Sequence, residues 1–278
     1  MTKTGESWVS VTEKGFFYAL GLFFALALKH HYSQADSDDL AWILYPTAAL
    51  VEALTGISFE KEARAGFISK GHGIIIAPAC AGVNFLIIAF STLYFTNIAR
   101  LMGTARRALW FALAAGIGYL VTLGVNALRI TVAVVLYKAD IYGGWITPDR
   151  VHRIEGTLVY CICLLVLHMG GEQIAGWLNR CELERTTAPA LKTHGLTPRL
   201  LTCAVPFLWY SFITVGVPVL NQAYGHSGPR FVEHGVLVLL VCLVVFVLFF
   251  LIRMGCYKMS LAVRKLSADL HDGAANNM

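Results

Sequence analysis

Long apolar runs separated by short polar segments form the dominant pattern along the chain. A helix that crosses a bilayer needs about 20 predominantly apolar residues, and several runs reach or approach that length. The predicted spans lie at about 16–30, 80–98, 108–126, 154–172, 200–220 and 235–253. The pattern therefore predicts an all-α fold, a polytopic membrane helical bundle in which residues 1–278 form a single transmembrane domain.

Two neighbouring segments do not fit this pattern of simple spans. The stretch LAWILYPTAALVEALTGISF at 40–59 is long enough to cross, but Pro46 and Glu52 interrupt it. Crossing there would also reverse the N-terminus, so we expect a helix that lies in or dips into the outer interface. The next stretch, 58–76, has mixed polarity and predicts a short outer hairpin.

The apolar stretch at 108–138 is too long for one simple span. As a single helix it would be ~46 Å long, against a hydrocarbon core of ~30 Å. Asn126 and Arg129 mark the expected exit from the bilayer, because burying a guanidinium at its centre costs at least ~2.5 kcal/mol. Residues 130–139 are therefore predicted to form a separate interfacial half-helix.

Charge distribution sets the orientation of the predicted spans. Lys and Arg concentrate in the connections 99–107 and 176–199 and in the tail after the last span, whereas the segment HHYSQADSDD is acidic. Because basic short loops mark the cytoplasmic side, these connections and the N-terminus are expected inside. We predict a multi-pass protein of the cytoplasmic (inner) membrane, with a cytoplasmic linker at 173–199 and further spanning helices and a cytoplasmic tail at 200–278.

Composition agrees with a membrane protein and argues against a nucleic-acid-binding one. Hydrophobic residues make up 57% of the chain and charged residues only 14%, with a mean hydropathy of +0.64. Soluble domains carry about a quarter charged residues. The net charge of +5 is spread over short loops rather than gathered in a stripe, so no nucleic-acid partner is expected.

Three chemically apt side chains fall at the outer boundary of successive deep segments: Cys80, Arg129 and His152. A free thiol has a pKa of about 8.5 and needs a base or a cation to become a thiolate at neutral pH. An imidazole can take that proton and later return it to a leaving amine. An arginine can hold a substrate carboxyl or stabilise an oxyanion. Together they supply what thiol acyl transfer requires, although their spacing alone is a weak signal.

Each of the three also has a plain structural interpretation. A membrane cysteine often only packs, an arginine can extend to lipid phosphates, and His152 lies between two arginines that suit headgroup contact. The other cysteines favour a role for Cys80, because three lie within spans and three on or near the inner side. Cys80 is then the only thiol expected outside, without a disulfide partner. The other six are Cys161, Cys163, Cys242, Cys181, Cys203 and Cys256.

Small and polar neighbours are candidates for binding or positioning a substrate. Asn84 comes one helical turn after Cys80, which would place both on one face of a helix. Asn126 comes one turn before Arg129 and is expected to position that side chain or to close the helix end. Gly82 and Gly156 would permit close approach of a substrate or of a neighbouring helix.

Other histidines do not form a convincing metal site in the sequence. His72, in the predicted hairpin, is a possible second imidazole, but a surface role is favoured. His168 and Glu172 are four residues apart, a spacing that can bind metal, yet they lie toward the inner end without a third ligand. The sequence HRIE, which begins at His152, lacks the second histidine of a metalloprotease helix. We therefore predict no metal and no other cofactor.

Three short motifs resemble those of one family of membrane enzymes. PACAGVNF around Cys80 resembles the A-C-S-G nucleophile motif of the exosortase/archaeosortase family, NALRI matches its N-x-x-R motif and HRIEG its H-x-x-x-G motif. The resemblance covers roughly residues 40 to 172, the expected catalytic core, and its wording is nearest to exosortases of the K type. Ala81 stands where many members have serine, which puts any role of that hydroxyl in doubt.

The resemblance implies a function and a set of partners. Members are viewed as cysteine transpeptidases that act on exported proteins bearing a C-terminal motif, a transmembrane helix and a basic tail. By this resemblance Cys80 is the nucleophile, Arg129 the substrate or oxyanion partner, and His152 the acid and base. The expected reaction is cleavage of the sorting signal at the outer face of the membrane through an acyl-thioester. The acyl acceptor is unidentified, and the other expected contact is membrane lipid.

Two other classes of function stay open from the sequence. A polytopic transporter would line a path across the bilayer with its polar residues, whereas here they gather at one face. A non-catalytic scaffold of an envelope or exopolysaccharide assembly system would tolerate loss of Arg129 or His152.

Overall fold

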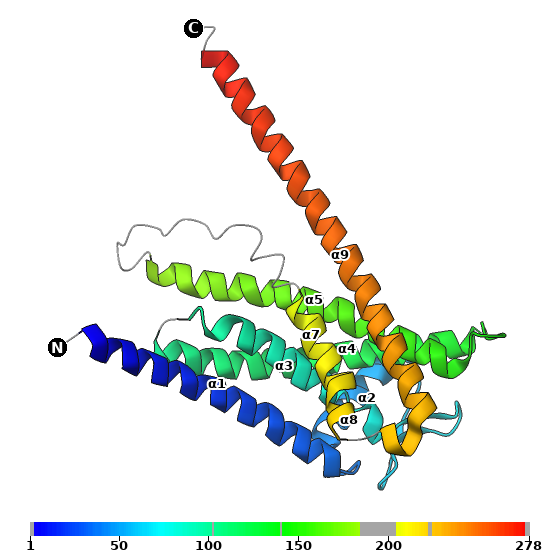
Figure 1. The fold of residues 1–278 in the computed structure, drawn as a ribbon. Coiled ribbons are helices and arrows are strands. Elements are labelled where there is room, and N and C mark those ends of the chain that lie inside the picture. The colour runs from blue at the N-terminus through cyan, green and yellow to red at the C-terminus, as the bar shows by residue number, and fades with distance from the viewer. Residues whose placement is uncertain (1–2, 102, 140, 184–203, 222–223, 276–278) are drawn as a thin grey trace.

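Helices dominate the chain in the computed structural model, which describes residues 3–101, 103–139, 141–183, 204–221 and 224–275 (Figure 1). The helices are α1 (Lys3–Gln34), α2 (Ala41–Thr55), α3 (Val83–Ile98), α4 (Thr104–Lys138), α5 (Pro148–Leu183), α7 (Val205–Ser211), α8 (Val217–Leu220) and α9 (Tyr224–Ala275). A 3-10 turn at Pro78–Cys80 precedes α3, and a π-helical turn at Phe212–Gly216 joins α7 to α8. The all-α polytopic membrane fold is confirmed.

Four stretches of the described chain are long and apolar enough to cross a membrane: Pro78–Arg100, Thr104–Lys138, Pro148–Leu178 and Phe231–Gly255. They contain the spans expected at 80–98, 108–126, 154–172 and 235–253. The expected span at 16–30 is helical within α1 but does not belong to these four. Of the span expected at 200–220, residues 205–220 form a shorter apolar helix with a π-helical turn inside it, and residues 200–203 lie outside the described residues.

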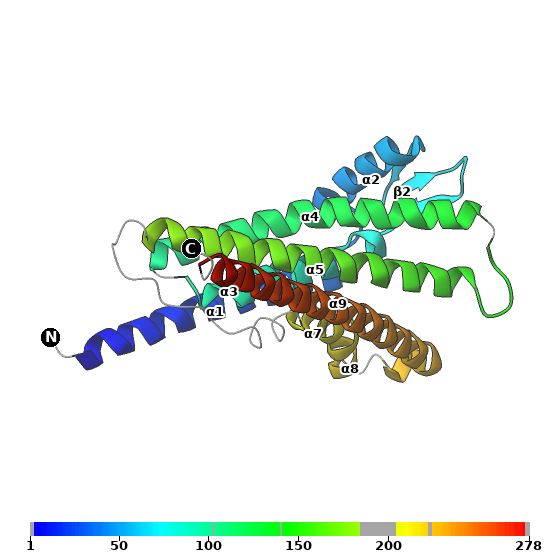
Figure 2. The ribbon, with the colours of Figure 1, turned by 90° about the horizontal axis from the view of Figure 1, so that it is seen from above.

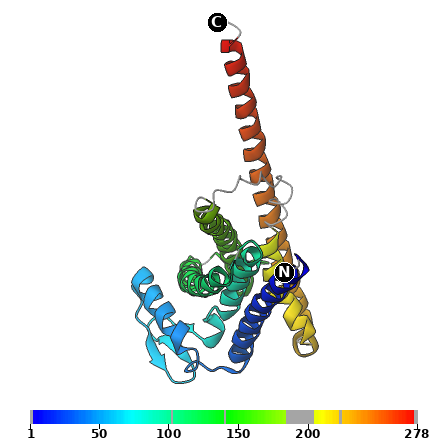
Figure 3. The ribbon, with the colours of Figure 1, turned by 90° about the vertical axis from the view of Figure 1, so that its left-hand side faces the viewer.

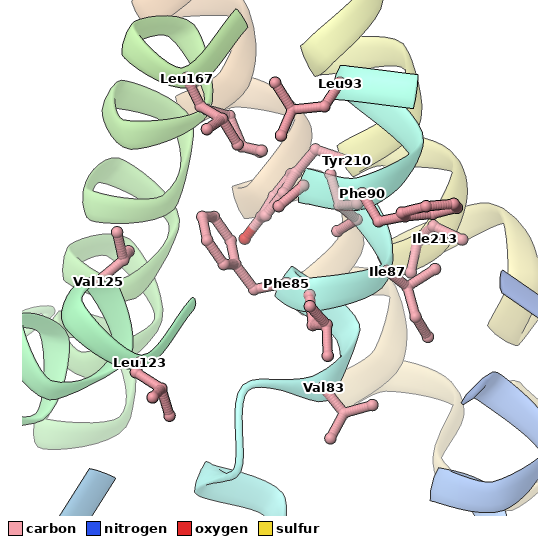
Figure 4. Packing of buried hydrophobic residues seen from close by; sticks show 14 of the residues in the cluster. Val83, Phe85, Ile87, Phe90, Leu93, Leu123, Val125, Leu167, Tyr210 and Ile213 are labelled. Atoms are coloured by element: carbon pink, nitrogen blue, oxygen red, sulfur yellow. The ribbon is translucent and has the colours of Figure 1, made fainter. Parts of the chain in front are cut away.

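Helix α3 forms the centre of the bundle. It packs against α1, α4, α5 and α7, and Figure 4 shows its apolar side chains meeting those of its neighbours. In its most apolar window 72% of the residues are buried, against 28% in the window of α9. Burial of large side chains such as Phe85, Phe90 and Tyr94 makes α3 a protein-covered core helix, whereas most of α9 is left for lipid.

Helix α4 is continuous, and this corrects the predicted break after Arg129 and the separate half-helix at 130–139. Its 35 residues correspond to about 52 Å. The expected cost of a buried guanidinium is reduced here, because Arg129 lies against the ring of Tyr160 rather than in lipid. The last turns of α4, up to the exposed Lys138, run beside the start of α5 at one end of the bundle (Figure 2).

The segment between α1 and α3 forms a cap at that same end. Helix α2 ends at Gly56, whose φ of 70° closes the helix in the left-handed region. Strands β1 (Glu60–Glu62), β2 (Gly66–Ser69) and β3 (Ile74–Ile76) follow as an antiparallel sheet in that order. The expected hairpin is thus present, with a third strand that leads directly to Cys80. Figures 2 and 3 show α2 and the strands beside α4, on the side of the bundle away from α8.

The C-terminal part differs from its predicted layout. The cytoplasmic linker was expected to begin at 173, but α5 continues to Leu183, and residues 184–199 of that linker lie outside the described residues. Helix α9 packs against α5 and continues as helix to Ala275, through most of the expected tail. Figure 1 shows its second half extending well past the rest of the bundle.

Candidate active site

A cavity of about 400 Å³ opens at the capped end of the bundle. Cys80, Arg129 and His152 all line it, from the 3-10 turn before α3, the last third of α4 and the first turn of α5. His72 lies at the same cavity, and much of the remaining lining is apolar or aromatic, as at Val134 and Tyr137. Residues 49 and 23 positions apart in the sequence therefore share one space. An apolar cleft with a few convergent polar groups is typical of a ligand site.

Cys80 sits at the end of the 3-10 turn rather than inside α3. Gly82 follows with a φ of 74°, which separates the turn from the helix. The amide of Asn126 donates to the carbonyl oxygen of Cys80 at 2.5 Å, and it accepts from the hydroxyl of Tyr160 at 3.0 Å. The backbone at Cys80 is thus tied to α4 and α5, while the thiol itself is free and partly exposed.

Arg129 is held by packing rather than by a direct ion pair. Its guanidinium carbon lies 5.3 Å from the ring centroid of Tyr160, within the range of a cation–π contact. Gly156 lets the chain of α5 pass close to it, because a Cβ there would lie 3.3 Å from Cδ of Arg129. The charge interacts electrostatically with Cys80 and with Glu155. A guanidinium held in place by packing therefore acts electrostatically on the thiol.

His152 lies near the start of α5 with half of its side chain exposed. Its Nδ1 is 4.0 Å from a carboxylate oxygen of Glu155, one turn later on the same helix. Arg129, Asp149 and Arg153 act on it electrostatically. The imidazole therefore meets the cavity on one side and a carboxylate on the other.

The expected roles of the two asparagines need correction. Asn84 does not share a helix with Cys80, because Gly82 separates the 3-10 turn from α3. Its side chain instead accepts a hydrogen bond from Nζ of Lys29 at 2.8 Å. Asn126 neither ends α4 nor bonds to Arg129, since its amide is used by Cys80 and Tyr160. Gly82 faces this amide: a Cβ there would lie 3.0 Å from Cγ of Asn126.

Helix α1 adds residues that sequence reasoning missed. Lys29 reaches Asn84 and also lies over the ring of Tyr32, at 5.6 Å from its centroid. Burial raises the pKa of the Tyr32 hydroxyl, the Cys80 thiolate raises it further, and Arg129 opposes that shift. Tyr32 is therefore close enough to the thiol and the guanidinium to sense both charges. A lysine near the end of an apolar run was the available signal, but Lys29 was counted as part of the span expected at 16–30.

Other groups singled out in the sequence lie away from the cavity. Cys161 and Cys242 are buried with their sulfurs 3.4 Å apart, between α5 and α9. Glu172 pairs with Arg100 at 3.1 Å, toward the opposite end of the bundle. His72, in contrast, lines the cavity, and its imidazole contacts the hydroxyl of Ser69 at 3.3 Å. Across the ranges given above, no group of three or more His, Cys, Asp or Glu side chains is arranged to hold a metal ion.

The family model for transmembrane exosortases matches residues 15–169, which is more than half of the 278-residue chain. The chain belongs to the transmembrane exosortase family. Membership assigns this exosortase, in general terms, a membrane transpeptidase role in protein sorting, with exported substrates that carry C-terminal sorting signals. The K-type assignment stays a prediction. No curated protein and no solved structure matches the chain.

The matched range contains every polar residue of the cavity discussed above. It begins within α1, so that Lys29 and Tyr32 belong to the exosortase region, and it ends within α5. Helices α7 to α9 lie beyond it. The catalytic roles expected for Cys80, Arg129 and His152 stay predictions.

Proposed function

We propose that this exosortase is a cysteine transpeptidase that cleaves the C-terminal sorting signal of exported proteins at the outer face of the cytoplasmic membrane. The observation that carries the proposal is the shared cavity: a partly exposed free thiol, a guanidinium and an imidazole line one space of about 400 Å³. These are the nucleophile, the oxyanion partner and the acid and base that peptide transfer through a thioester requires.

In the proposed reaction, His152 accepts the proton of the Cys80 thiol and the thiolate attacks the carbonyl carbon of the scissile peptide bond. The carbonyl oxygen becomes an oxyanion, which the guanidinium of Arg129 stabilises. Collapse of this intermediate breaks the C–N bond, and His152 returns its proton to the leaving amine. The acyl group is then held as a thioester on Cys80.

Resolution of the thioester needs a second nucleophile. An amine or water gives up a proton to His152 and attacks the thioester carbonyl, which releases the acyl group and regenerates the thiol. An amine acceptor makes the outcome transpeptidation, and water makes it proteolysis. The apolar part of the cavity, with Val134 and Tyr137 on α4, suits the start of a substrate's own transmembrane helix.

The charges at the two ends of the bundle support an outward-facing site. Arg100 and Arg107 lie at the end opposite the cavity, paired with Glu172 and Glu13 at 3.1 and 3.2 Å. Basic residues in short connections are typical of the cytoplasmic side, which supports the proposal that the cavity faces outward. An oxidising outer compartment also suits a single nucleophilic thiol without a cysteine partner nearby.

The first experiment replaces the proposed nucleophile. Cys80→Ala is expected to leave the precursor of a sorted protein uncleaved, because no other described cysteine lines the cavity. Cys163→Ala, a thiol exchange on α5 away from the cavity, is the matched control and should process normally. Immunoblots of precursor and product, with membrane levels of each variant, provide the measurement. Normal processing by Cys80→Ala would exclude the nucleophile role and favour a scaffold or a transporter.

A second experiment tests the covalent step itself. Brief incubation with substrate followed by acid quenching should trap a fragment on the peptide that contains Cys80, and neutral hydroxylamine should release it as expected for a thioester. Arg129→Lys retains the charge but not the planar fork, so we expect it to lower the rate of thioester formation by at least tenfold. Wild-type rates in that variant would argue against the oxyanion role.

A further inference from the structure

One buried carboxylate beside the cavity has no place in the three-residue mechanism. Glu155 lies on α5, three residues after His152 and therefore on the same face of the helix. Its side chain is 7% exposed, and neither carboxylate oxygen has a hydrogen-bond partner among the described residues. Burying a charged carboxylate without a partner is costly, so this position requires a proton or a nearby donor.

Two groups are near enough to satisfy this carboxylate. One is His152, whose Nδ1 lies 4.0 Å from Oε2. The other is Arg129 on α4, which interacts with Glu155 electrostatically. The structure has no direct hydrogen bond between Glu155 and Arg129, and the Nε of Arg129 is itself buried without a partner. Contacts that act in catalysis are often long in a free enzyme and shorten when substrate binds.

We propose that Glu155 is a positioning residue for His152, an inference that rests on the proposed function of the cavity. Its carboxylate accepts a hydrogen bond from Nδ1–H of the imidazole, which leaves Nε2 as the nitrogen that exchanges a proton with the Cys80 thiol. In its ionised form the carboxylate stabilises the imidazolium that forms when the thiol is deprotonated. In this arrangement the imidazole of His152 lies between the thiol of Cys80 and the carboxylate of Glu155, with Arg129 beside them.

The alternative is that Glu155 serves only as the counter-charge of Arg129. In that case its loss would change the setting of the guanidinium and the local field, without acting through the imidazole. The two roles predict opposite effects on the thiol. Removing a bystander negative charge favours the thiolate, whereas removing a group that stabilises the imidazolium disfavours the thiolate–imidazolium pair.

Reactivity of Cys80 toward iodoacetamide separates these roles without a substrate. The full-length protein in detergent is alkylated between pH 5.5 and 9, and the peptide that contains Cys80 is quantified by mass spectrometry. For Glu155→Gln we expect the midpoint of alkylation to move up by about one pH unit and the rate at neutral pH to fall roughly tenfold. Glu172→Gln, the same exchange far along α5, is the matched control and should keep the wild-type profile.

A double variant shows whether the effect passes through the imidazole. In the His152→Ala background, Glu155→Gln is expected to change nothing further, because the group it positions is gone. An unmoved or lowered midpoint in Glu155→Gln, or an effect that persists without His152, would overturn the proposal in favour of the counter-charge. Glu155→Asp is a second test if Gln impairs folding: its shorter carboxylate should fail to restore the profile, and full restoration would point to Arg129.

Other titrating groups at the site need to be separated from this effect. Arg129 on α4 and Asp149 and Arg153 on α5 act on His152, and they are unchanged in every variant. His72, from the hairpin, is the second imidazole of the cavity, and His72→Ala should leave the effect of Glu155→Gln intact. Failure here is distinct from failure of the proposed function: the former leaves processing dependent on Cys80, whereas the latter shows normal processing in Cys80→Ala.

Discussion

At the scale of single residues, Asn126 joins the three elements that meet at the cavity. Its amide donates to the backbone of the turn before α3, belongs to α4 and accepts from Tyr160 of α5. Each such hydrogen bond contributes about 1 kcal/mol, but an unpaired buried group costs more. The placement of Cys80, the proposed nucleophile, therefore depends on a side chain that does not touch the thiol.

Separate variants distinguish the two hydrogen bonds of this amide. Asn126→Ala removes both, and we expect roughly a tenfold loss in the rate of Cys80 alkylation or processing. Tyr160→Phe removes only the hydroxyl, while the ring stays against Arg129 and Phe85, so its rate should fall less than threefold. Equal losses in both variants would instead show that the contact with Cys80 is unimportant. Alkylation rates measured side by side give the comparison.

The chemical types of three residues identified part of this site from the sequence. The residues that contact them in space were missed. Cys80, Arg129 and His152 stood out because a thiol, a guanidinium and an imidazole have known uses together. Glu155 was read only as part of a failed metal motif, and Tyr160 was not singled out within the span expected at 154–172. The significance of Tyr160 lies in its contact with Asn126, 34 positions away, which periodicity does not reveal. Glu155 lies only three residues after His152, but the sequence did not show that its carboxylate is buried beside the cavity.

At the scale of elements, the break between the 3-10 turn and α3 positions Cys80, the proposed nucleophile. Gly82 adopts a left-handed conformation there, and its missing side chain makes room for Asn126. Had α3 begun at Cys80, as the apolar run suggested, the thiol would have projected from the surface of that helix. Apolar periodicity locates a helix, but it does not fix the residue at which the helix begins.

Substitution at this glycine tests the importance of the break. Gly82→Ala should reduce the free energy of unfolding by about 1–2 kcal/mol, because an L-residue is strained in that conformation. Cys80 alkylation should slow as well, since the new Cβ would press on Asn126. Gly124→Ala is the control: it lies in α4 with open space around it and should be neutral or stabilising by up to ~1 kcal/mol. Thermal unfolding in detergent, followed by circular dichroism, measures the stability of both variants.

The continuity of α4 shows why the cost of a buried charge was misjudged. The expected break rested on the cost of Arg129 in lipid, but the neighbouring helices α3 and α5 replace lipid on that side. An aromatic ring and a nearby carboxylate lower the cost that an isolated helix would meet. A sequence shows the charge of one residue, whereas only the packed bundle shows what surrounds it.

At the scale of the whole molecule, the family region and the C-terminal helices are packed together. Helix α9 packs obliquely against α5 (Figure 1), and buried Cys161 and Cys242 meet between them. Arg150, near the start of α5, also bonds to Glu233 of α9 at 2.7 Å. The additional helices thus contact the same helix that carries His152.

Oxidation of the two buried thiols tests this packing. Copper phenanthroline should accept two electrons and allow a disulfide to form between Cys161 and Cys242, with loss of two protons, because their sulfurs are 3.4 Å apart. With a protease site inserted between residues 184 and 203, the cleaved halves should migrate together on a non-reducing gel. They should separate in Cys161→Ser, and in the wild type after reduction. Separation without reduction would show that α9 does not lie on α5 as described.

The hydrogen bond from Asn126 ends on the main-chain oxygen of Cys80 rather than on its sulfur. Replacing the sulfur by oxygen in Cys80→Ser therefore leaves this hydrogen bond and the cavity in place, while the thiol proposed as the nucleophile is lost. We expect the Cys80→Ser protein to bind its precursor without cleaving it. The bound precursor can then be co-purified and sequenced, which identifies the recognised sorting signal.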